Sequence, residues 1–512
     1  MRGVSGGEQR EPRPEVLGGL VEPFRVKPRI VRAFVDPGVF SGVSYQLVVA
    51  AAGLLGALVL LTFLSNAVLA WQLEPFDHSE GWNAYNAAAA MGGGPLYPSH
   101  SGLWFANYPP LSFFVVGSLG QLTGDYIVTG RALSLLSAIV AAFAIGTTAR
   151  WMGCSKFESA LAALLFLASP WVVAKFAGID DPQMLGQALG CAGFATVIRE
   201  PRRARSVVLG ALLLTLALFV KPLFVDQPLA LVIWLGIGER RTALLFAVAG
   251  VVFGLVGIAA ADHFLHVDLL DHLLSARVYS FSRMFSHPGQ WLLTGLVPLV
   301  ATLYLFRHRH DRYAILCAIY AAVALAFSLF FCGGEGVGGN PTIDLSIATA
   351  LGVAVFINRA RAGMMPQYFD VRIERVVALA SLSLLSIALA ASAIVGWDSG
   401  ATIRERLSER PAARRDIAYI VMHPGPALCE TPSLCYWAHK SVQVDVWGYS
   451  QALKKRSRTE SALIGLLNAR YFRTVQLDRR SSLSYFADTR AAFARNYRTV
   501  YADAFGVFLV PQ

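Results

Sequence analysis

The chain has 512 residues, of which 55% are hydrophobic and only 15% are charged, and its mean hydropathy is +0.51. A soluble globular protein averages about 25% charged residues, so this composition excludes an ordinary soluble enzyme and indicates a membrane protein. The net charge of +11 does not indicate nucleic-acid binding, because the basic residues are dispersed through short loops and the C-terminal region without a basic and aromatic binding module.

The N-terminal residues 1–45 form a leader rich in Pro and Gly, which we expect to be flexible and cytoplasmic. A cleavable signal peptide is not indicated, because the first apolar run, from about Gln46 to Trp71, exceeds a signal core of about 7–15 residues. We predict two further regions. Residues 46–396 form a transmembrane region with an external loop at 72–126, and residues 397–512 form a small extracytoplasmic α/β domain.

Apolar stretches close to the roughly 20 residues that cross a bilayer predict an all-α polytopic membrane region of about eleven spans. They lie near residues 46–71, 127–149, 157–177, 183–198, 206–220, 223–238, 242–261, 290–306, 313–332, 342–357 and 375–396. The apolar stretch Pro110–Leu122 is the alternative further span. We predict that it is a shallow helix on the outer face, because it is short and follows a Tyr-Pro-Pro break.

The distribution of Lys and Arg favours eleven spans with a cytoplasmic N-terminus. That topology places 22 basic residues of the leader and membrane region inside and five outside, a strong positive-inside signal. A crossing by Pro110–Leu122 would invert every later loop and abolish the signal. We therefore predict a multi-pass protein of the inner (plasma) membrane whose C-terminal domain lies outside. The five outer basic residues are Arg131, Lys175, Lys221, Arg277 and Arg283.

The six cysteines fall into two groups. Four lie within or at the ends of predicted spans, where a buried structural thiol is expected: Cys154, Cys191, Cys317 and Cys332. Cys429 and Cys435 both lie in the predicted external domain. An oxidising compartment would favour a disulfide between them.

The first external loop is unusually acidic. Glu74, Asp77 and Glu80 follow the first span directly, with His78 among them and no Lys or Arg to neutralise them. We interpret this loop as functional rather than as a solvated acidic loop, because unneutralised carboxylates are unusual beside lipid phosphates. On a helix, Asn83 continues the polar face of Glu80. Further candidate substrate contacts are Asn83, Tyr85, Tyr108 and Asp180.

A second acidic pair, Asp180 and Asp181, precedes Pro182 between the third and fourth predicted spans. One carboxylate is enough to cap the following helix, so the pair exceeds what a cap needs. On the same outer side, Arg131 and Lys221 defy the positive-inside pattern. We interpret them as phosphate ligands rather than as cations that snorkel to the interface.

Carboxylates that face phosphate-binding cations at the outer membrane boundary indicate a specific reaction. The cations would hold the leaving phosphate of a lipid-linked sugar, and a carboxylate would deprotonate the acceptor hydroxyl as general base. The candidate catalytic carboxylates are Asp77, Glu80 and Asp181. One carboxylate suffices for an inverting single displacement, so no cofactor is required.

These motifs, in this order, resemble the GT-C superfamily of polytopic glycosyltransferases, in particular the protein O-mannosyltransferase and aminoarabinose transferase group, often called family 39/83-like. The motifs are the run from Glu80 to Tyr97, the step Tyr108-Pro-Pro-Leu111, Arg131, Asp181-Pro182 and Lys221. The resemblance covers roughly residues 45–240. It implies transfer of a sugar from a polyprenyl-phosphate donor to a hydroxyl of a glycolipid, lipopolysaccharide or protein on the outer face.

The resemblance also assigns individual residues of the first loop. Glu80 matches the Glu of an Asp-Glu pair that opens this loop in the family. The family's catalytic Asp would fall on Ser79, which is a departure, so Asp77 or Glu80 must supply the base. A Lys that precedes a Pro in some relatives is Tyr108 in this chain, so one phosphate contact of the family has no counterpart.

The remaining matches are charged residues at the ends of spans. Asp181 matches the Asp of an Asp-Pro step after the third span, and Arg131 and Lys221 match basic residues at the second and fifth spans. Some relatives bind a divalent metal near the first loop, for which His78 and His263 are the candidate ligands.

The region beyond Trp397 reads as a small α/β cap. The expected strands are 417–422, 441–446 and 472–477, and the expected amphipathic helices are 459–468 and 482–495. The main alternative function is a polytopic transporter or lipid flippase. Such a protein would show intramembrane charges, broken helices or inverted repeats.

Overall fold

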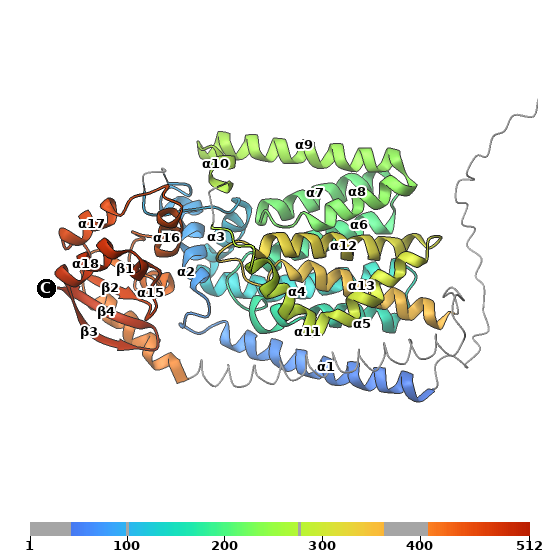
Figure 1. Ribbon diagram of the computed structural model, residues 1–512, viewed down its shortest axis with the longest axis horizontal. Coiled ribbons are helices and arrows are strands. Elements are labelled where there is room, and N and C mark those ends of the chain that lie inside the picture. Colours follow the sequence, from blue (N-terminus) through green and yellow to red (C-terminus); the bar gives the residue numbers. More distant parts are fainter. Residues whose placement is uncertain (1–41, 99–101, 275–277, 363–407) are drawn as a thin grey trace, which may run out of the picture. The chain divides into compact units, whose positions relative to one another are not determined.

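The computed structural model of the chain describes residues 42–98, 102–274, 278–362 and 408–512. Most of them are helical, and the strands are confined to the C-terminal part (Figure 1). The first part of the chain contains α1 (Gly42–Leu69), α2 (His78–Ala88), η1 (Ala89–Gly93), α3 (Leu111–Thr123), α4 (Tyr126–Trp151), α5 (Lys156–Leu167), η2 (Val172–Phe176), α6 (Gln183–Arg199), α7 (Ala204–Val220), α8 (Asp226–Gly238), α9 (Arg240–Leu265), α10 (Leu269–Leu273), α11 (Arg283–Tyr304), η3 (Leu305–Arg307), α12 (Arg312–Cys332) and α13 (Thr342–Arg361).

Six described helices are long and apolar enough to cross a membrane, namely α1, α4, α9, α11, α12 and α13. They coincide with six of the predicted spans and confirm an all-α polytopic membrane region. The predicted spans at 183–198, 206–220 and 223–238 correspond to the shorter helices α6, α7 and α8. The predicted span at 375–396 lies outside the described residues, so the count of eleven stays a prediction.

The predicted span at 157–177 corresponds to α5 and η2, and the helix is interrupted between them. Helix α5 ends at Leu167, and the chain resumes a helical course at Pro170 before η2. A proline cannot donate the hydrogen bond that would continue a helix, and it suits the first turn of a new one. The stretch expected as a surface helix forms α3, which packs beside α2, α4 and α7.

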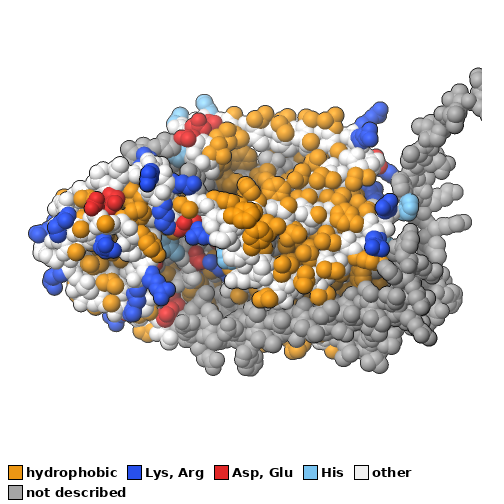
Figure 2. All heavy atoms as spheres, viewed as in Figure 1, with side chains coloured by type: hydrophobic (Ala, Val, Ile, Leu, Met, Phe, Trp, Pro, Cys, Tyr) orange, Lys and Arg blue, Asp and Glu red, His pale blue; other side chains and the backbone are white. Residues whose placement is uncertain are grey.

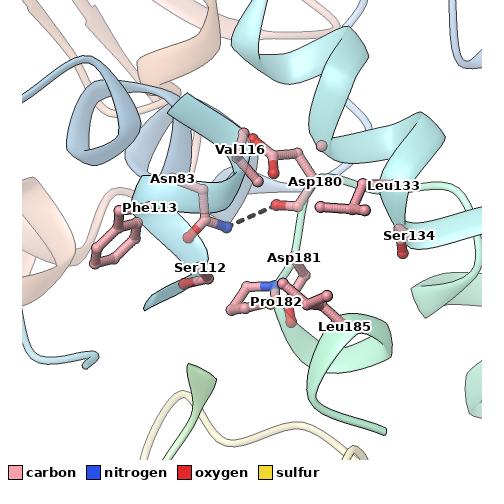
Figure 3. Close-up of a pocket in the computed structure, with 11 residues that line it drawn as sticks. Asn83, Ser112, Phe113, Val116, Leu133, Ser134, Asp180, Asp181, Pro182 and Leu185 are labelled. Atoms are coloured by element: carbon pink, nitrogen blue, oxygen red, sulfur yellow. Dashed lines mark hydrogen bonds between the residues drawn. The ribbon is translucent and has the colours of Figure 1, made fainter. Parts of the chain in front are cut away.

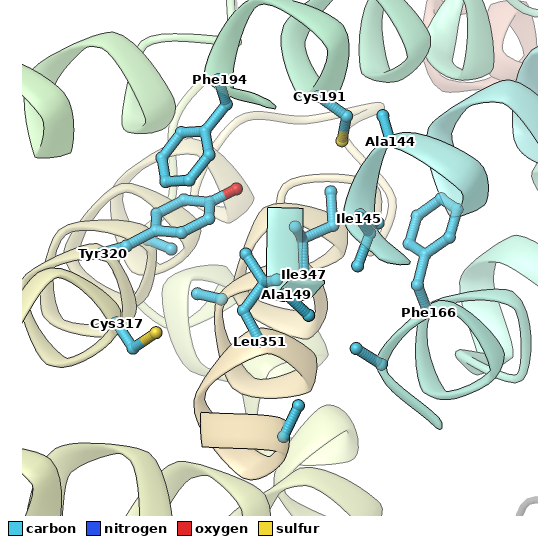
Figure 4. Packing of buried hydrophobic residues seen from close by; sticks show 14 of the residues in the cluster. Ala144, Ile145, Ala149, Phe166, Cys191, Phe194, Cys317, Tyr320, Ile347 and Leu351 are labelled. Carbon is cyan, nitrogen blue, oxygen red and sulfur yellow. The ribbon is translucent and has the colours of Figure 1, made fainter. Parts of the chain in front are cut away.

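Helix α13 is the most deeply buried of the long helices and packs against α4, α5, α11 and α12. Figure 4 shows Ile347 and Leu351 of α13 among Ile145 of α4, Phe166 of α5 and Tyr320 of α12. In contrast, α9 exposes most of its apolar side chains. Figure 2 shows hydrophobic side chains over the membrane helices and Lys and Arg side chains at their ends, the distribution expected for helices solvated by lipid.

The C-terminal part combines short helices with a small sheet. Residues 408–422 are helical and are followed by β1 (Ala427–Cys429), α15 (Pro432–Trp437), α16 (Val446–Lys454), α17 (Ser461–Asn468), β2 (Thr474–Leu477), η4 (Ser482–Tyr485), α18 (Ala487–Asn496), β3 (Tyr497–Asp503) and β4 (Gly506–Pro511). The strand order is β1-β2-β4-β3, in which β1 is parallel to β2 and β4 is antiparallel to both neighbours. Gly506 begins β4 directly after the turn at residues 504 and 505 and has a φ of +119°, a conformation that favours glycine.

The predicted small α/β domain is confirmed, but two of its predicted strands are wrong. Residues 417–422 are helical, since Ala413, Asp416 and Ile420 are buried at the three- and four-residue spacing of a helix face. Residues 441–445 form a loop before α16. The predicted strand at 472–477 and the helices at 459–468 and 482–495 correspond to β2, α17 and η4–α18. The expected domain boundary at 397 lies outside the described residues.

The C-terminal part contacts the first loop of the membrane region directly. Helix α15 packs against α2 at Gly81, where a Cβ atom would lie 2.1 Å from the backbone nitrogen of Ser433. The Nε1 of Trp437 donates to the Oδ2 of Asp125 at 3.0 Å, at the start of α4. Cys429 and Cys435 form a disulfide beside this contact, whereas the four cysteines of the membrane region are free and buried.

Candidate active site

Glu80 of α2 and Arg131 of α4 form a fully buried ion pair. The two Glu80 carboxylate oxygens accept from the Nε and Nη2 of Arg131 at 2.7 and 2.6 Å, a bidentate geometry. The same carboxylate accepts from the backbone nitrogens of Phe76 at 2.8 Å and Asp180 at 3.1 Å. Glu80 thereby joins the first loop to α4 and to the segment before α6.

The remaining Arg131 donors are also engaged by the protein. Its Nη1 donates to the carbonyl oxygens of Ala70 and Gln72, and its Nη2 donates to that of Glu74. The guanidinium carbon lies 3.7 Å from the centre of the Phe76 ring. Arg131 therefore organises the chain that leads from α1 to α2, and this geometry leaves it no free donor for a substrate phosphate.

Asp77, just before α2, pairs with Lys175 of η2, and both side chains are partly exposed. The Oδ2 of Asp77 lies 2.7 Å from the Nζ of Lys175, and its Oδ1 accepts from the backbone nitrogen and hydroxyl of Ser79. Burial alone would raise the pKa of Asp77, but the Lys175 charge and these hydrogen bonds outweigh burial and lower it. Asp77 is therefore an ionised carboxylate within reach of solvent.

Asp181 and Lys221 form a second pair, which is nearly buried, with an Oδ1–Nζ distance of 3.0 Å. The Nζ of Lys221 also lies 5.1 Å from the centre of the Tyr108 ring. Burial would lower the pKa of Lys221, but Asp181 and Tyr108 raise it, so the ammonium stays charged. The Phe176 ring links the two pairs, since the Nζ atoms of Lys175 and Lys221 lie 5.6 and 5.8 Å from its centre.

Asp180 is buried, and Figure 3 shows its main chain beside Asn83 of α2, whose Nδ2 donates to the Asp180 carbonyl oxygen at 2.6 Å. Burial, followed by the charges of Glu80 and Asp181, raises the pKa of Asp180 well above its ordinary value. Its side chain packs against α4 at Gly130, where a Cβ atom would lie 1.9 Å from the Asp180 Oδ1.

A small pocket lies between these residues and α3 (Figure 3). Three buried polar atoms of its lining have no hydrogen-bond partner among the described residues: the Oδ1 of Asn83, the Oγ of Ser112 and the Oδ2 of Asp180. The pocket encloses about 10 Å³, which is room for about one water molecule or one hydroxyl group. Such a set of polar atoms would bind a single hydroxyl group.

We refer to Asp77, Glu80, Arg131, Lys175, Asp180, Asp181 and Lys221 as the loop cluster. It contains four carboxyl groups and three cations. Asp180 is the carboxyl group of the cluster whose pKa is raised, and each of the other three carboxyl groups faces one cation. Each cation of the loop cluster therefore has one carboxyl partner.

Other residues predicted for the site lie apart from the loop cluster or serve other contacts. The Oη of Tyr85 donates to the carbonyl oxygen of Lys440 at 2.7 Å, so this side chain binds the C-terminal part. His78 interacts electrostatically with Asp445, and His263 packs on Phe264. Within the described ranges, no three His, Cys, Asp or Glu residues are arranged to hold a metal ion.

Arg277 and Arg283 are the other two arginines that the sequence analysis places on the outer side. Arg283 of α11 pairs with Glu335 at 3.2 Å, and Lys454 of the C-terminal part pairs with the same carboxylate. Arg277 lies outside the described residues.

A second polar cluster, which we did not predict from the sequence, lies inside the helix bundle. The Asp344 carboxylate of α13 accepts from the Nε2 of Gln187 at 2.8 Å, the Nε2 of Gln227 at 3.0 Å and the hydroxyl of Tyr320 at 2.8 Å. Asp226 of α8 is also buried, and its Oδ1 has no hydrogen-bond partner within the described ranges.

We call these five residues, with Gln183 and Asn340, the helix cluster. Asn340 donates to the Oε1 of Gln183 at 3.2 Å, and Gln183 follows Asp181 by two residues, so the two clusters are neighbours. The sequence signal was a set of isolated polar residues in otherwise apolar helices. Gln183 and Gln187 stand four residues apart on one face of α6.

The sequence matches no protein-family model and no curated protein. The structure is similar to ArnT from Cupriavidus metallidurans, solved with undecaprenyl phosphate bound and in the apo state. The bound form has a TM-score of 0.62 at 14% identity and covers 88% of this chain and 97% of that chain. The apo form has a TM-score of 0.61 at 14% identity, and the match covers 90% of this chain and 98% of that chain.

An oligosaccharyltransferase from Archaeoglobus fulgidus, solved with a tethered acceptor peptide, matches with a TM-score of 0.45 and 11% identity over 92% of this chain and 74% of that chain. Because the two ArnT structures are only 14% identical to this chain, their similarity shows the fold and not the function. The chain has the fold of the GT-C superfamily, which confirms the resemblance predicted from its motifs at the level of fold.

Proposed function

We propose that this protein is a membrane glycosyltransferase that moves a sugar from a polyprenyl-phosphate donor to an acceptor hydroxyl on the outer face of the inner membrane. The observation that carries this proposal is the pair of carboxylate–ammonium contacts, Asp77–Lys175 and Asp181–Lys221, on either side of Phe176. Ammonium groups bind phosphate, and an ionised carboxylate can accept a proton. The ArnT structure with undecaprenyl phosphate supports the donor class.

In the proposed reaction, Asp77 takes the proton of the acceptor hydroxyl as its oxygen bonds to the anomeric carbon of the sugar. The bond from that carbon to the phosphate oxygen breaks, and the phosphate leaves with the electron pair. We assign the base to Asp77 because Glu80 already accepts four hydrogen bonds, whereas Asp77 is partly exposed. The resemblance places the family's catalytic Asp at Ser79, which cannot act as a carboxylate base. Asp77, two residues earlier, would supply the missing carboxylate.

Lys221 and Lys175 are the phosphate ligands in this proposal, and Arg131 is a positioning residue. Each ammonium group has three donors; its carboxylate partner uses one of them, and at Lys221 a hydrogen bond with Tyr108 uses a second. Asp181 holds Lys221 in place, and the protonated Asp180 with Asn83 and Ser112 binds one hydroxyl of the sugar. No step in this scheme uses a metal, so a chelator should leave the rate unchanged.

The test is a transfer assay with purified full-length protein, polyprenyl-phosphate sugars and extracted envelope glycolipids, with release of polyprenyl phosphate as the readout. Asp77→Asn should lower kcat by about 10²–10⁴, the usual contribution of a general base. Lys221→Met should raise KM as well. Asp488→Asn, an exposed carboxylate of α18, is the matched control and should keep the full rate. Full activity of folded Asp77→Asn protein would refute the assignment of the base.

Two observations favour transport instead, namely the helix cluster and the interruption of the helix between α5 and η2. Buried carboxylates among membrane helices are common on the pathways of transporters. Counterflow of a lipid-linked or soluble sugar in proteoliposomes, lost in Asp344→Asn and retained in Asp77→Asn, would favour a transporter. Sugar transfer with the opposite dependence on these two residues would favour the enzyme.

A further inference from the structure

A second pocket lies at the far end of the membrane helices from the loop cluster. Helix α6 begins beside Asp181 and ends at Arg199 after 17 residues, which at about 1.5 Å per residue separates its two ends by roughly 25 Å. The pocket is formed where α4 ends, α6 ends and α7 begins. It encloses about 340 Å³, a volume within the range of ligand sites.

The pocket has an excess of positive charge. Its lining includes the guanidinium groups of Arg199, Arg203 and Arg205 but a single carboxylate, Glu200. Glu200 is already paired with Arg203 at 2.9 Å and accepts from the hydroxyl of Ser206 at 3.2 Å. Two guanidinium groups are thus left to meet an anion.

Neither arginine forms an ion pair with a carboxylate among the residues that the structure describes, although the charge of Arg199 also acts on Glu200. Arg199 lies over the Trp151 ring, with its guanidinium carbon 5.7 Å from the ring centre, and Arg205 is exposed. In contrast, the adjacent Arg202 pairs with Glu239 at 2.6 Å and does not line the pocket. A guanidinium fork matches the oxygens of a phosphate group.

Two apolar side chains, Trp151 and Leu209, complete the lining beside the hydroxyl groups of Thr196 and Ser206. Trp151 is 39% exposed and Leu209 is 49% exposed, on helices whose outer surface is apolar. Tryptophan is enriched where a membrane meets water, with its ring at the level of lipid headgroups. A soluble anion would use only the basic half of this pocket, whereas a lipid would use both halves.

We propose that this pocket binds the phosphate group of an anionic membrane lipid from the leaflet around this end of the helices. Arg199 and Arg205 hold the phosphate oxygens, and an acyl chain follows Leu209 along α7. Basic pockets between transmembrane helices are suited to such headgroups. The site is separate from the sugar-transfer site and does not depend on that function.

The probe is phosphatidylglycerol, titrated against the purified full-length protein in detergent, with bound lipid counted by native mass spectrometry. The double variant Arg199→Gln/Arg205→Gln should bind at least about tenfold more weakly, because it loses two charge-assisted contacts. The matched control is Arg240→Gln/Arg241→Gln, which removes the same charge from exposed positions at the start of α9 and should bind as the wild type does. Equal losses in both double variants would overturn the proposal.

Two further arms separate the ligand sources. Phosphatidylcholine, which carries no net charge, should bind at least tenfold more weakly than phosphatidylglycerol, and millimolar inorganic phosphate should not displace the lipid. Glu200→Gln removes the single carboxylate of the pocket and should tighten phosphatidylglycerol binding, which keeps the test open if the double variant does not fold. Displacement by inorganic phosphate, or unchanged binding in Glu200→Gln, would overturn the lipid assignment.

Discussion

The loop cluster and the helix cluster both bury carboxyl groups at neighbouring positions, but only the loop cluster supplies cations to meet them. Glu80 faces Arg131 and Asp181 faces Lys221, whereas Asp344 is held by two amides and a phenol. An ion pair fixes the position and the charge of both partners. A carboxyl group held by neutral donors can keep its contacts whether or not it carries a proton. The first arrangement suits a preorganised site, and the second suits a structural or exchangeable one.

The largest expected effect comes from breaking the charge balance of the loop cluster. Arg131→Met should lower the free energy of unfolding by about 3–5 kcal/mol, because it leaves Glu80 as a buried carboxylate without its partner. Thermal unfolding of the purified protein measures this loss. The control is Arg283→Met, which breaks a partly exposed pair and should cost less than about 1 kcal/mol. Equal losses in the two variants would contradict the expectation that a buried ion pair stabilises the protein more than a partly exposed one.

A steric change tests how closely Asp180 is held against α4. Gly130→Ala places a Cβ atom 1.9 Å from the Asp180 Oδ1, and such overpacking should cost about 1–3 kcal/mol and displace the carboxyl group. The matched control is Gly250→Ala in α9, where no atom lies within 4 Å of the new Cβ. Unfolding midpoints and the rate of sugar transfer should both fall in the first variant only. Unchanged values for Gly130→Ala would show that this contact is not rigid.

The helix cluster should tolerate loss of its charge. In Asp344→Asn, the amide oxygen still accepts from Gln227 and Tyr320, and its new donor can meet the free Oε1 of Gln187 when that amide turns over. We expect a change of no more than about 1 kcal/mol in the free energy of unfolding. Asp181→Asn, which leaves Lys221 buried and unpaired, should cost several times more. A larger loss for Asp344→Asn than for Asp181→Asn would reverse the comparison.

The smallest effect is a dependence on pH. Burial and the neighbouring charges raise the pKa of Asp180 above the value of about 3.9 in the unfolded chain. Above that value the folded protein binds more protons than the unfolded one, so this group lowers stability as pH rises. Asp180→Asn cannot titrate. Its unfolding midpoint relative to the wild type should therefore increase as the pH rises above the unfolded value of about 3.9, and a constant difference would contradict the assignment.

Much of the fold follows from the sequence because apolar length and charge placement act locally. Helices α4, α12 and α13 lie within a few residues of the predicted spans, and the cysteine pair of the C-terminal part is bridged. The errors arose where tertiary packing decides. The apolar residues of 417–422 suit a strand as well as a helix, and burial of Asp416 on a helix face settled the choice.

The sequence analysis singled out the residues of the loop cluster but not their pairing. Glu80 and Arg131 stand 51 residues apart, and a basic residue that defies the positive-inside pattern indicates a buried ion pair as readily as a phosphate ligand. Spacing along the chain could not distinguish these, because the partner comes from another helix. The helix cluster was not predicted from the sequence for the same reason. Gln187, Gln227 and Asp344 are single polar residues until three helices bring them together.

The contact between α15 and α2 has a consequence for synthesis of the chain. The residues of the loop cluster are complete at Lys221, but Ser433 and Trp437, which contact Gly81 and Asp125, are translated about 200 residues later. At about 5–20 residues per second, this interval lasts roughly 10–40 s. A chain released early would enter the membrane with α2 lacking its partner. Only chains translated past Trp437 can gain the contact, so α2 meets this partner late in translation.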